Sequence, residues 1–283
     1  MFVHSFNPIL FDFGIIAIRW YSLAYIFGII LGLSYGKYLI RKFYFHENVK
    51  PHHLDDFLIW IVLGIILGGR LGYVIFYNLQ FYLQNPLDIF KIWSGGMSFH
   101  GGMIGLIIAT AFFVKKNNIS FWLLTDVLAC VAPIGLFFGR IANFINGELV
   151  GKPTDIAWSV IFPMYDNVAR HPSQLYEALL EGLVLFIVVN QIFKKNTTRI
   201  GYPSFLFLFL YSFFRICAEF FREPDQHIGY VFPNISLGII LSFITIVLSF
   251  VILIKINKND FKKNNKKKKI IFRSIYKLLF IQI

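Results

Sequence analysis

The sequence predicts an all-α polytopic membrane protein with seven transmembrane helices, its N-terminus outside, its C-terminus in the cytoplasm and a small irregular head outside the membrane. The chain of 283 residues is 57% hydrophobic and only 15% charged, whereas a soluble domain carries roughly a quarter charged residues. Its mean hydropathy is +0.65, and its apolar residues form runs long enough to cross a hydrocarbon core of about 30 Å. The placement of the basic residues is the third observation.

Seven apolar runs are predicted to cross the membrane in chain order. They are Ile15–Leu39, Phe57–Tyr77, Phe99–Val114, Phe121–Phe138, Gln174–Phe193, Tyr202–Phe221 and Ile235–Ile254. The third run is short for a crossing, and three glycines near its start weaken it further as a helix. The charge distribution decides whether it counts as a span.

With seven crossings, most of the 27 Lys and Arg residues lie on one side of the membrane. They fall in the segments Lys37–Lys50, Lys115–Lys116, Lys194–Arg199 and Lys255–Lys277. Loops rich in Lys and Arg stay in the cytoplasm, so this side is predicted to be cytoplasmic. Without the third span the lysine-rich tail would lie outside, which favours the model with seven spans.

We expect two regions, a membrane domain over residues 1–256 and a lysine-rich cytoplasmic tail over residues 257–283. The outer loop at about 143–173 contains three prolines and is too long for a simple turn, which predicts a small head there. The apolar end of the tail, Ile270–Ile283, is either an interfacial helix or a loosely ordered segment. The net charge of +12 is explained by topology and by contact with anionic membrane lipids, so no nucleic acid is needed.

The two cysteines, Cys130 and Cys217, lie within apolar runs. Two buried small side chains are favoured over a disulfide between them. The sequence contains no CxxC, HExxH or Walker-type motif, so neither a metal nor a nucleotide cofactor is expected.

Polar residues gather where the predicted spans meet the outer face. Arg140 follows the run Phe121–Phe138 directly and opens a stretch that contains two asparagines and a glutamate. An ionisable side chain at membrane depth costs about 2.5–3.5 kcal/mol on insertion scales, which makes it a functional candidate. The alternative is an arginine that only snorkels to the lipid headgroups. Arg70, His100 and Arg215 occupy comparable positions on other spans, and this recurrence favours function.

His100 lies among four glycines, in a segment that is expected to bend. Histidine is the commonest general base because its ordinary pKa is near 6.5. Further along the chain, Glu177 and Glu181 are one helical turn apart and share a face directed at something polar.

Arg215, Glu219 and Arg222 recur at i, i+4 and i+7 and form one charged ridge on an apolar helix. A purely structural pair between Arg215 and Glu219 would leave Arg222 and Arg140 unexplained. Guanidinium groups bind phosphate oxygens bidentately and stay charged at any relevant pH. Several arginines beside a histidine therefore suit a phosphate held next to a reacting group, and a lipid headgroup supplies one at this surface.

Together these motifs resemble the bacterial prolipoprotein diacylglyceryl transferase family. The matching segments occur in the family's order and are Arg19–Ser22, Gly68–Tyr73, Gly96–Gly102, Gly139–Glu148, Arg170–Glu177 and Arg215–Arg222. The ordered set is specific, although Ala142 stands where the family usually has glycine, the loop from Pro163 to Arg170 is short and the tail is long. The resemblance implies seven spans in the bacterial cytoplasmic (inner) membrane, with the active site towards the periplasmic face.

The resemblance also implies the reaction. The diacylglyceryl group of phosphatidylglycerol is moved to the thiol of the lipobox cysteine in the signal peptide of a prolipoprotein, which forms a thioether and releases glycerol 1-phosphate. The implied catalytic residues are His100, Arg140 and Arg215, with the phosphate between the two arginines and His100 as either the base for the thiol or an orienting group. The implied substrate-binding residues are Tyr21, Arg70, Asn143, Asn146, Glu148, Gly151, His171, Tyr211, Glu219 and Arg222.

The substrate supplies the nucleophile, so the resemblance requires neither cysteine of this chain and no cofactor or metal. A transporter or flippase for an anionic solute or lipid is the alternative function. It would need polar residues spread across the membrane, whereas here they concentrate near the outer face, apart from residues such as Asp126.

Overall fold

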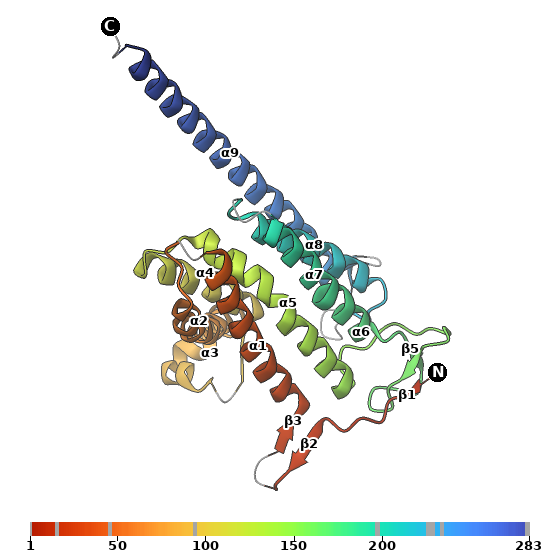
Figure 1. The fold of residues 1–283 in the computed structure, drawn as a ribbon. Coiled ribbons are helices and arrows are strands. Elements are labelled where there is room, and N and C mark those ends of the chain that lie inside the picture. The colour runs from red at the N-terminus through yellow and green to blue at the C-terminus, as the bar shows by residue number, and fades with distance from the viewer. Residues whose placement is uncertain are drawn as a thin grey trace. The chain divides into compact units, whose positions relative to one another are not determined.

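The computed structural model describes residues 2–14, 17–44, 47–92, 95–195, 199–224, 230–232 and 235–280 (Figure 1). Most of these residues are helical, and the chain divides into two compact units. Unit 1 comprises Met1–Gly32 and Leu128–Ile283, and unit 2 comprises Leu33–Val127. Helices α1 (Trp20–Phe43) and α5 (Phe121–Asn146) each contribute residues to both units.

Unit 2 is built on the pair of helices α2 (His52–Tyr77) and α4 (Phe99–Lys116), joined through α3 (Leu79–Gln84) and the 3-10 helix η1 (Pro86–Phe90). The two long helices touch through glycines. A methyl group added at Gly105 would meet the carbonyl oxygen of Gly64, and one at Gly101 would meet that of Gly68. Small residues let helix backbones approach closely in membranes. The glycines that weaken the third span as an isolated helix therefore form its packing face.

Unit 1 contains a second group of helices. The segment Ser173–Lys195 is one continuous helix made of α6 (Ser173–Glu177), the π-helix η3 (Ala178–Val184) and α7 (Leu185–Lys195). Helix α8 (Tyr202–Glu219) lies beside α7 and packs along α9 (Leu237–Phe280), as Figure 1 shows. Asn190 of α7 donates to the carbonyl oxygen of Cys130 on α5 at 3.0 Å, so a polar contact ties the two helices together.

Short strands lie at the ends of these helices. Strand β1 (Phe2–Val3) pairs in parallel with β4 (Val160–Ile161), which pairs antiparallel with β5 (Ala169–Arg170). Val150, Val160 and Phe162 form a small buried core under this sheet, with Phe144 of α5 packed on it. Two antiparallel pairs complete the description, β2 (Ile9–Asp12) with β3 (Ala17–Arg19) and β6 (Tyr230–Phe232) with β7 (Ile235–Ser236).

The prediction of an all-α membrane protein is confirmed in its coarse form. In the described part of the chain, five helices are long and apolar enough to cross a membrane. They are Trp20–Phe43, His52–Tyr77, Phe121–Asn146, Ser173–Lys195 and Leu237–Lys258. The other two predicted spans are also helical, as α4 and α8, each 18 residues long, but they are not among the five.

Several predicted boundaries differ from the structure. The first span begins at Trp20 rather than Ile15, because Ala17–Arg19 pairs with β2 as a strand; Ile15 and Ile16 lie outside the described residues. Helix α5 runs beyond Phe138 to Asn146 and ends at Gly147, whose φ of 67° lies in the left-handed region that favours glycine. The first four residues of the predicted head, 143–146, therefore lie in this helix.

The C-terminal tail continues the last span as one helix. The backbone of α9 is helical from Leu237 to Phe280, whereas the sequence left a loosely ordered end as an alternative. No glycine or proline occurs after Gly238, so no strong helix breaker interrupts this segment.

Candidate active site

Six charged residues of unit 1, four of them buried and two half-buried, form a single network, which we call the arginine–glutamate cluster. Its members are Arg140 of α5, Glu177 of α6, Glu181 of η3, Arg215 and Glu219 of α8, and Arg222 just beyond α8. The side chains of Glu177 and Glu181 are fully buried, at 0% exposure. Buried charges need partners, and the cluster supplies them from three different helical segments.

Glu177 joins two of the arginines. Its Oε2 atom lies 2.9 Å from Nη1 of Arg140 and accepts from Nη1 of Arg215 at 2.8 Å. Arg140 uses its second terminal nitrogen, Nη2, to donate to Oε2 of Glu181 at 3.2 Å. Arg140 thus spans two carboxylates with two different nitrogens, which a planar guanidinium allows.

Glu219 joins Arg215 to the third arginine. Its Oε1 atom accepts from Nη2 of Arg215 at 2.5 Å and from Nη1 of Arg222 at 3.1 Å. Its Oε2 atom accepts from the hydroxyl of Ser236 at 2.8 Å. The three positive and three negative formal charges of the cluster cancel, so each guanidinium is oriented by carboxylates before any further anion arrives.

The π-helix lies within this cluster. Glu177 ends α6, and Glu181 lies inside η3, where the helix is wound more widely than an α-helix. Such single-turn π segments occur frequently at functional sites. Both glutamates face the arginines across this turn. Their spacing was noted in the sequence, but neither residue was among the predicted site residues, because spacing alone does not reveal the partner.

A smaller polar group lies at the end of α5. Asn143 and Asn146 both approach the carboxylate of Glu148, at 3.4 and 3.1 Å respectively. The main chain of Glu148 is fixed as well, since its carbonyl oxygen accepts from Nε2 of Gln174 at 2.6 Å. Tyr21, in the first turn of α1, accepts from the hydroxyl of Tyr25 at 3.0 Å, and Tyr211 lies one turn before Arg215 on α8.

Gly151 lies where three chain segments cross. It forms a bridge with Arg222 and donates its backbone N–H to the carbonyl oxygen of His171 at 3.1 Å. A methyl group here would meet the carbonyl oxygens of His171 and Phe221, so only glycine fits. Partial burial, together with the positive charge of Lys152, lowers the pKa of His171 from its usual value near 6.5, which keeps this imidazole neutral at pH 7.

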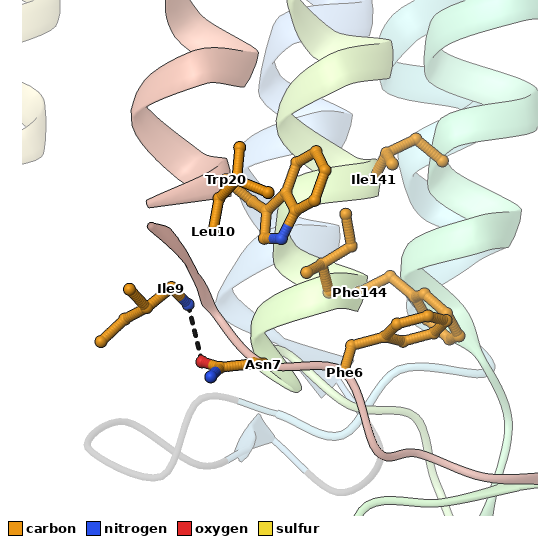
Figure 2. A pocket seen from close by; sticks show the side chains of 8 residues that line it. Phe6, Asn7, Ile9, Leu10, Trp20, Ile141 and Phe144 are labelled. Atoms are coloured by element: carbon orange, nitrogen blue, oxygen red, sulfur yellow. Dashed lines mark hydrogen bonds between the residues drawn. The ribbon is translucent and has the colours of Figure 1, made fainter. Parts of the chain in front are cut away.

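An apolar cavity of about 480 Å³ lies beside the helix turn that carries Arg140. Figure 2 shows Trp20, Ile141 and Phe144 around it, with Phe6 closing one side. Its lining residues are Phe6, Asn7, Ile9, Leu10, Trp20, Ile141, Phe144 and Ile145. One face of α5 therefore presents charge while the next presents an apolar recess, an arrangement suited to an amphipathic ligand.

His100 and Arg70 belong to unit 2. His100 is in the first turn of α4, and its side chain lies outside what the structure describes. The helix start is capped by Ser98, whose hydroxyl accepts from the backbone N–H of Gly101 at 3.1 Å. Of the predicted site residues, Arg215, Glu219 and Arg222 form direct ion pairs with one another, and Arg140 joins them through Glu177. Asn143 and Asn146 likewise contact Glu148 directly.

Comparison with known proteins identifies the family. Residues 8–255 match the family model described as prolipoprotein diacylglyceryl transferase. A phosphatidylglycerol–prolipoprotein diacylglyceryl transferase of Rickettsia bellii is 50% identical over 253 residues, covering 89% of this chain and 95% of the relative. Proteins of the same name from Rickettsia felis (51% identity, 84% and 92% covered) and Allorhizobium ampelinum (49% identity, 83% and 85% covered) are similarly close. The chain belongs to the prolipoprotein diacylglyceryl transferase family.

Proposed function

We propose that this protein is a transferase that moves the diacylglyceryl group of phosphatidylglycerol to the lipobox cysteine of prolipoproteins. The observation that carries the proposal is the arginine–glutamate cluster, which holds three oriented guanidinium groups. Family membership and the names of the relatives agree with this reaction. A transferase acting on a phospholipid needs such groups, because its leaving group is a phosphate ester.

In the proposed reaction the substrate thiolate attacks the glyceryl carbon that carries the phosphate. A carbon–sulfur bond forms, the carbon–oxygen bond to the phosphate breaks, and the electron pair leaves on the oxygen of glycerol 1-phosphate. Arg140 and Arg215 stabilise this developing charge, an effect worth several kcal/mol where donors are preorganised. The free thiol has a pKa near 8.5 and is mostly protonated at pH 7, and His100 is the proposed group that takes or orients its proton.

The remaining polar residues are proposed to hold the substrates. Tyr21 and Tyr211 would line the headgroup pocket together with the polar group at the end of α5, which consists of Asn143, Asn146 and the carboxylate of Glu148. His171, Gly151, Glu219 and Arg222 would fix the walls of that pocket. The apolar cavity next to Arg140 supports a lipid substrate, since it places an apolar surface beside the proposed phosphate site.

We propose the topology that the basic loops indicate, with seven spans, the N-terminus outside and the active site towards the periplasmic face of the inner membrane. In this model residues 1–256 form the membrane domain, the segment after α5 forms the periplasmic head, and residues 257–283 form the cytoplasmic tail.

The decisive experiment incubates the purified protein with phosphatidylglycerol vesicles and a lipobox peptide, followed by mass spectrometry of the peptide. We expect the mass of a diacylglyceryl thioether, and none with a peptide whose cysteine is replaced by serine. A flippase would move labelled lipid between leaflets and leave the cysteine unmodified. That outcome would refute the transferase.

A further inference from the structure

We infer that Arg70 is a positioning residue, which fixes the start of the helix that carries His100 instead of binding phosphate. The inference rests on the proposed function and concerns unit 2 alone. It departs from the substrate-binding role that the family resemblance implies for Arg70, and the departure comes from the partners of its guanidinium group.

All five N–H donors of the Arg70 guanidinium point to backbone carbonyl oxygens. The acceptors and distances are Asp88 (2.6 Å), Ile89 (2.8 Å), Lys91 (3.1 Å), Gly95 (2.5 Å) and Gly96 (3.2 Å). Five is the full donor set of an arginine. The residue is only 3% exposed, and the ring of Tyr82 lies 5.2 Å from the central carbon of the guanidinium. No donor is left for a phosphate oxygen.

Arg70 also differs from the arginines of the cluster in the kind of partner it has. Arg140 and Arg215 contact carboxylates, whereas the hydrogen bonds of Arg70 go to main-chain dipoles. Asp88 contributes its carbonyl oxygen to these acceptors, and its side-chain carboxylate pairs with Lys91 at 2.6 Å. The guanidinium therefore holds five main-chain carbonyl groups in place. Lysine has only three N–H donors and cannot replace it.

The last carbonyl group that Arg70 holds, that of Gly96, lies shortly before the start of α4. Gly96 has a φ of 81°, and a methyl group there would meet the ring of Tyr73 and Nη1 of Arg70. Two residues later, the backbone N–H of Ser98 donates to the carbonyl oxygen of Gly69 at 2.8 Å. Ser98 is also the cap of α4. Arg70 and its neighbour Gly69 thus fix both the approach to the helix and its capping residue.

His100 is the second residue of α4, so its backbone position follows from these contacts. A misplacement of about 1 Å can cost about 100-fold in rate without changing the chemistry. We therefore expect Arg70→Lys to lower kcat by about 10- to 100-fold, with KM for phosphatidylglycerol within about twofold of the parent. Gly96→Ala disturbs the same contacts from the loop side: it keeps the Arg70 side chain, whose Nη1 atom the added methyl group would meet, and it should give the same kinetic pattern.

The test measures kcat and KM with phosphatidylglycerol vesicles and a lipobox peptide, together with the NMR resonances of ¹³C-labelled histidine. The His100 resonance is assigned by its loss in His100→Asn. We expect it to shift in Arg70→Lys and in Gly96→Ala, and to stay in place in the control Arg19→Lys, whose parent side chain is exposed.

A rise in KM for phosphatidylglycerol with Arg70→Lys, or an unchanged His100 resonance in folded variants, would overturn the inference. If Arg70→Lys does not fold, Gly96→Ala decides by the same two readouts. A parent protein that forms no thioether would refute the proposed function instead, and the shift of the His100 resonance would still report on the positioning role.

Discussion

Replacing Arg140 by lysine tests the proposed phosphate site while keeping the charge. Arg140 reaches Glu177 with Nη1 at 2.9 Å and Glu181 with Nη2 at 3.2 Å. A lysine has one nitrogen on a flexible stem and cannot hold both carboxylates in one plane. The variant therefore loses one contact to a buried carboxylate and the bidentate geometry that a phosphate requires.

Two magnitudes follow from this geometry. One hydrogen bond to a charged group contributes about 1.5–3 kcal/mol to stability. The loss should fall near the lower figure, because Arg215 lies 3.7 Å from the other oxygen of Glu181 and remains a partner. In catalysis, losing one donor that acts in the transition state costs about 2–4 kcal/mol, which corresponds to roughly 30- to 1,000-fold in rate.

The assay measures the initial rate of thioether formation at saturating phosphatidylglycerol, at equal amounts of folded protein. Arg19→Lys is the matched control, because Arg19 is exposed on β3 and lies outside the cluster; its rate should stay within about threefold of the parent. If Arg140→Lys retains the parent rate while Arg19→Lys is inactive, the phosphate has been assigned to the wrong helix.

Three further predictions follow. Cys130→Ser combined with Cys217→Ser should retain transfer activity, since the attacking sulfur belongs to the peptide; loss of turnover in the folded variant would indicate an enzyme-bound intermediate. Removing Lys258–Ile283 should preserve turnover per inserted molecule while lowering membrane yield, and an inserted but inactive truncation would contradict the domain assignment. Hydrogen bonds from Arg170 hold the pKa of the Asp166 carboxyl below its usual value near 3.8. This pair stabilises the fold fully above that value and loses its contribution as the pH falls below it. Asp166→Asn should therefore cost about 1 kcal/mol at pH 7, and its melting-temperature deficit should shrink towards pH 3; a deficit that grows on acidification would contradict the pairing.

The sequence was sufficient to predict the class of fold and the ridge of arginines on α8, because both leave strong local patterns. Apolar runs located the helices, and the i, i+4, i+7 spacing of Arg215, Glu219 and Arg222 located the charged ridge that the structure confirms. Two cysteines without a disulfide were also expected, but only Cys130 is buried, whereas Cys217 is half-buried. The N-terminal boundary was wrong, since Ala17–Arg19 is apolar enough for a helix but finds a strand partner in β2.

What remained beyond the sequence depends on contacts between distant segments. Glu177 was visible as a polar residue, yet its two nearest arginine partners are 37 and 38 positions away. The role of Arg70 was assigned by analogy, and only the carbonyl oxygens around it show that its donors are occupied. Likewise, the glycines of α4 weaken an isolated helix, but they form a packing surface against α2.

The arginine–glutamate cluster also constrains how the protein is made. Its charges arrive in separate helices as the chain emerges: one positive charge on α5, two negative charges on Ser173–Lys195, and a net positive charge on α8 and the turn that follows. A helix that entered the bilayer alone would carry an unmatched charge that costs a few kcal/mol. Neutrality is reached only when the third helix joins the first two. We therefore expect α5 to reach its full stability in the membrane only after its later partners have been translated.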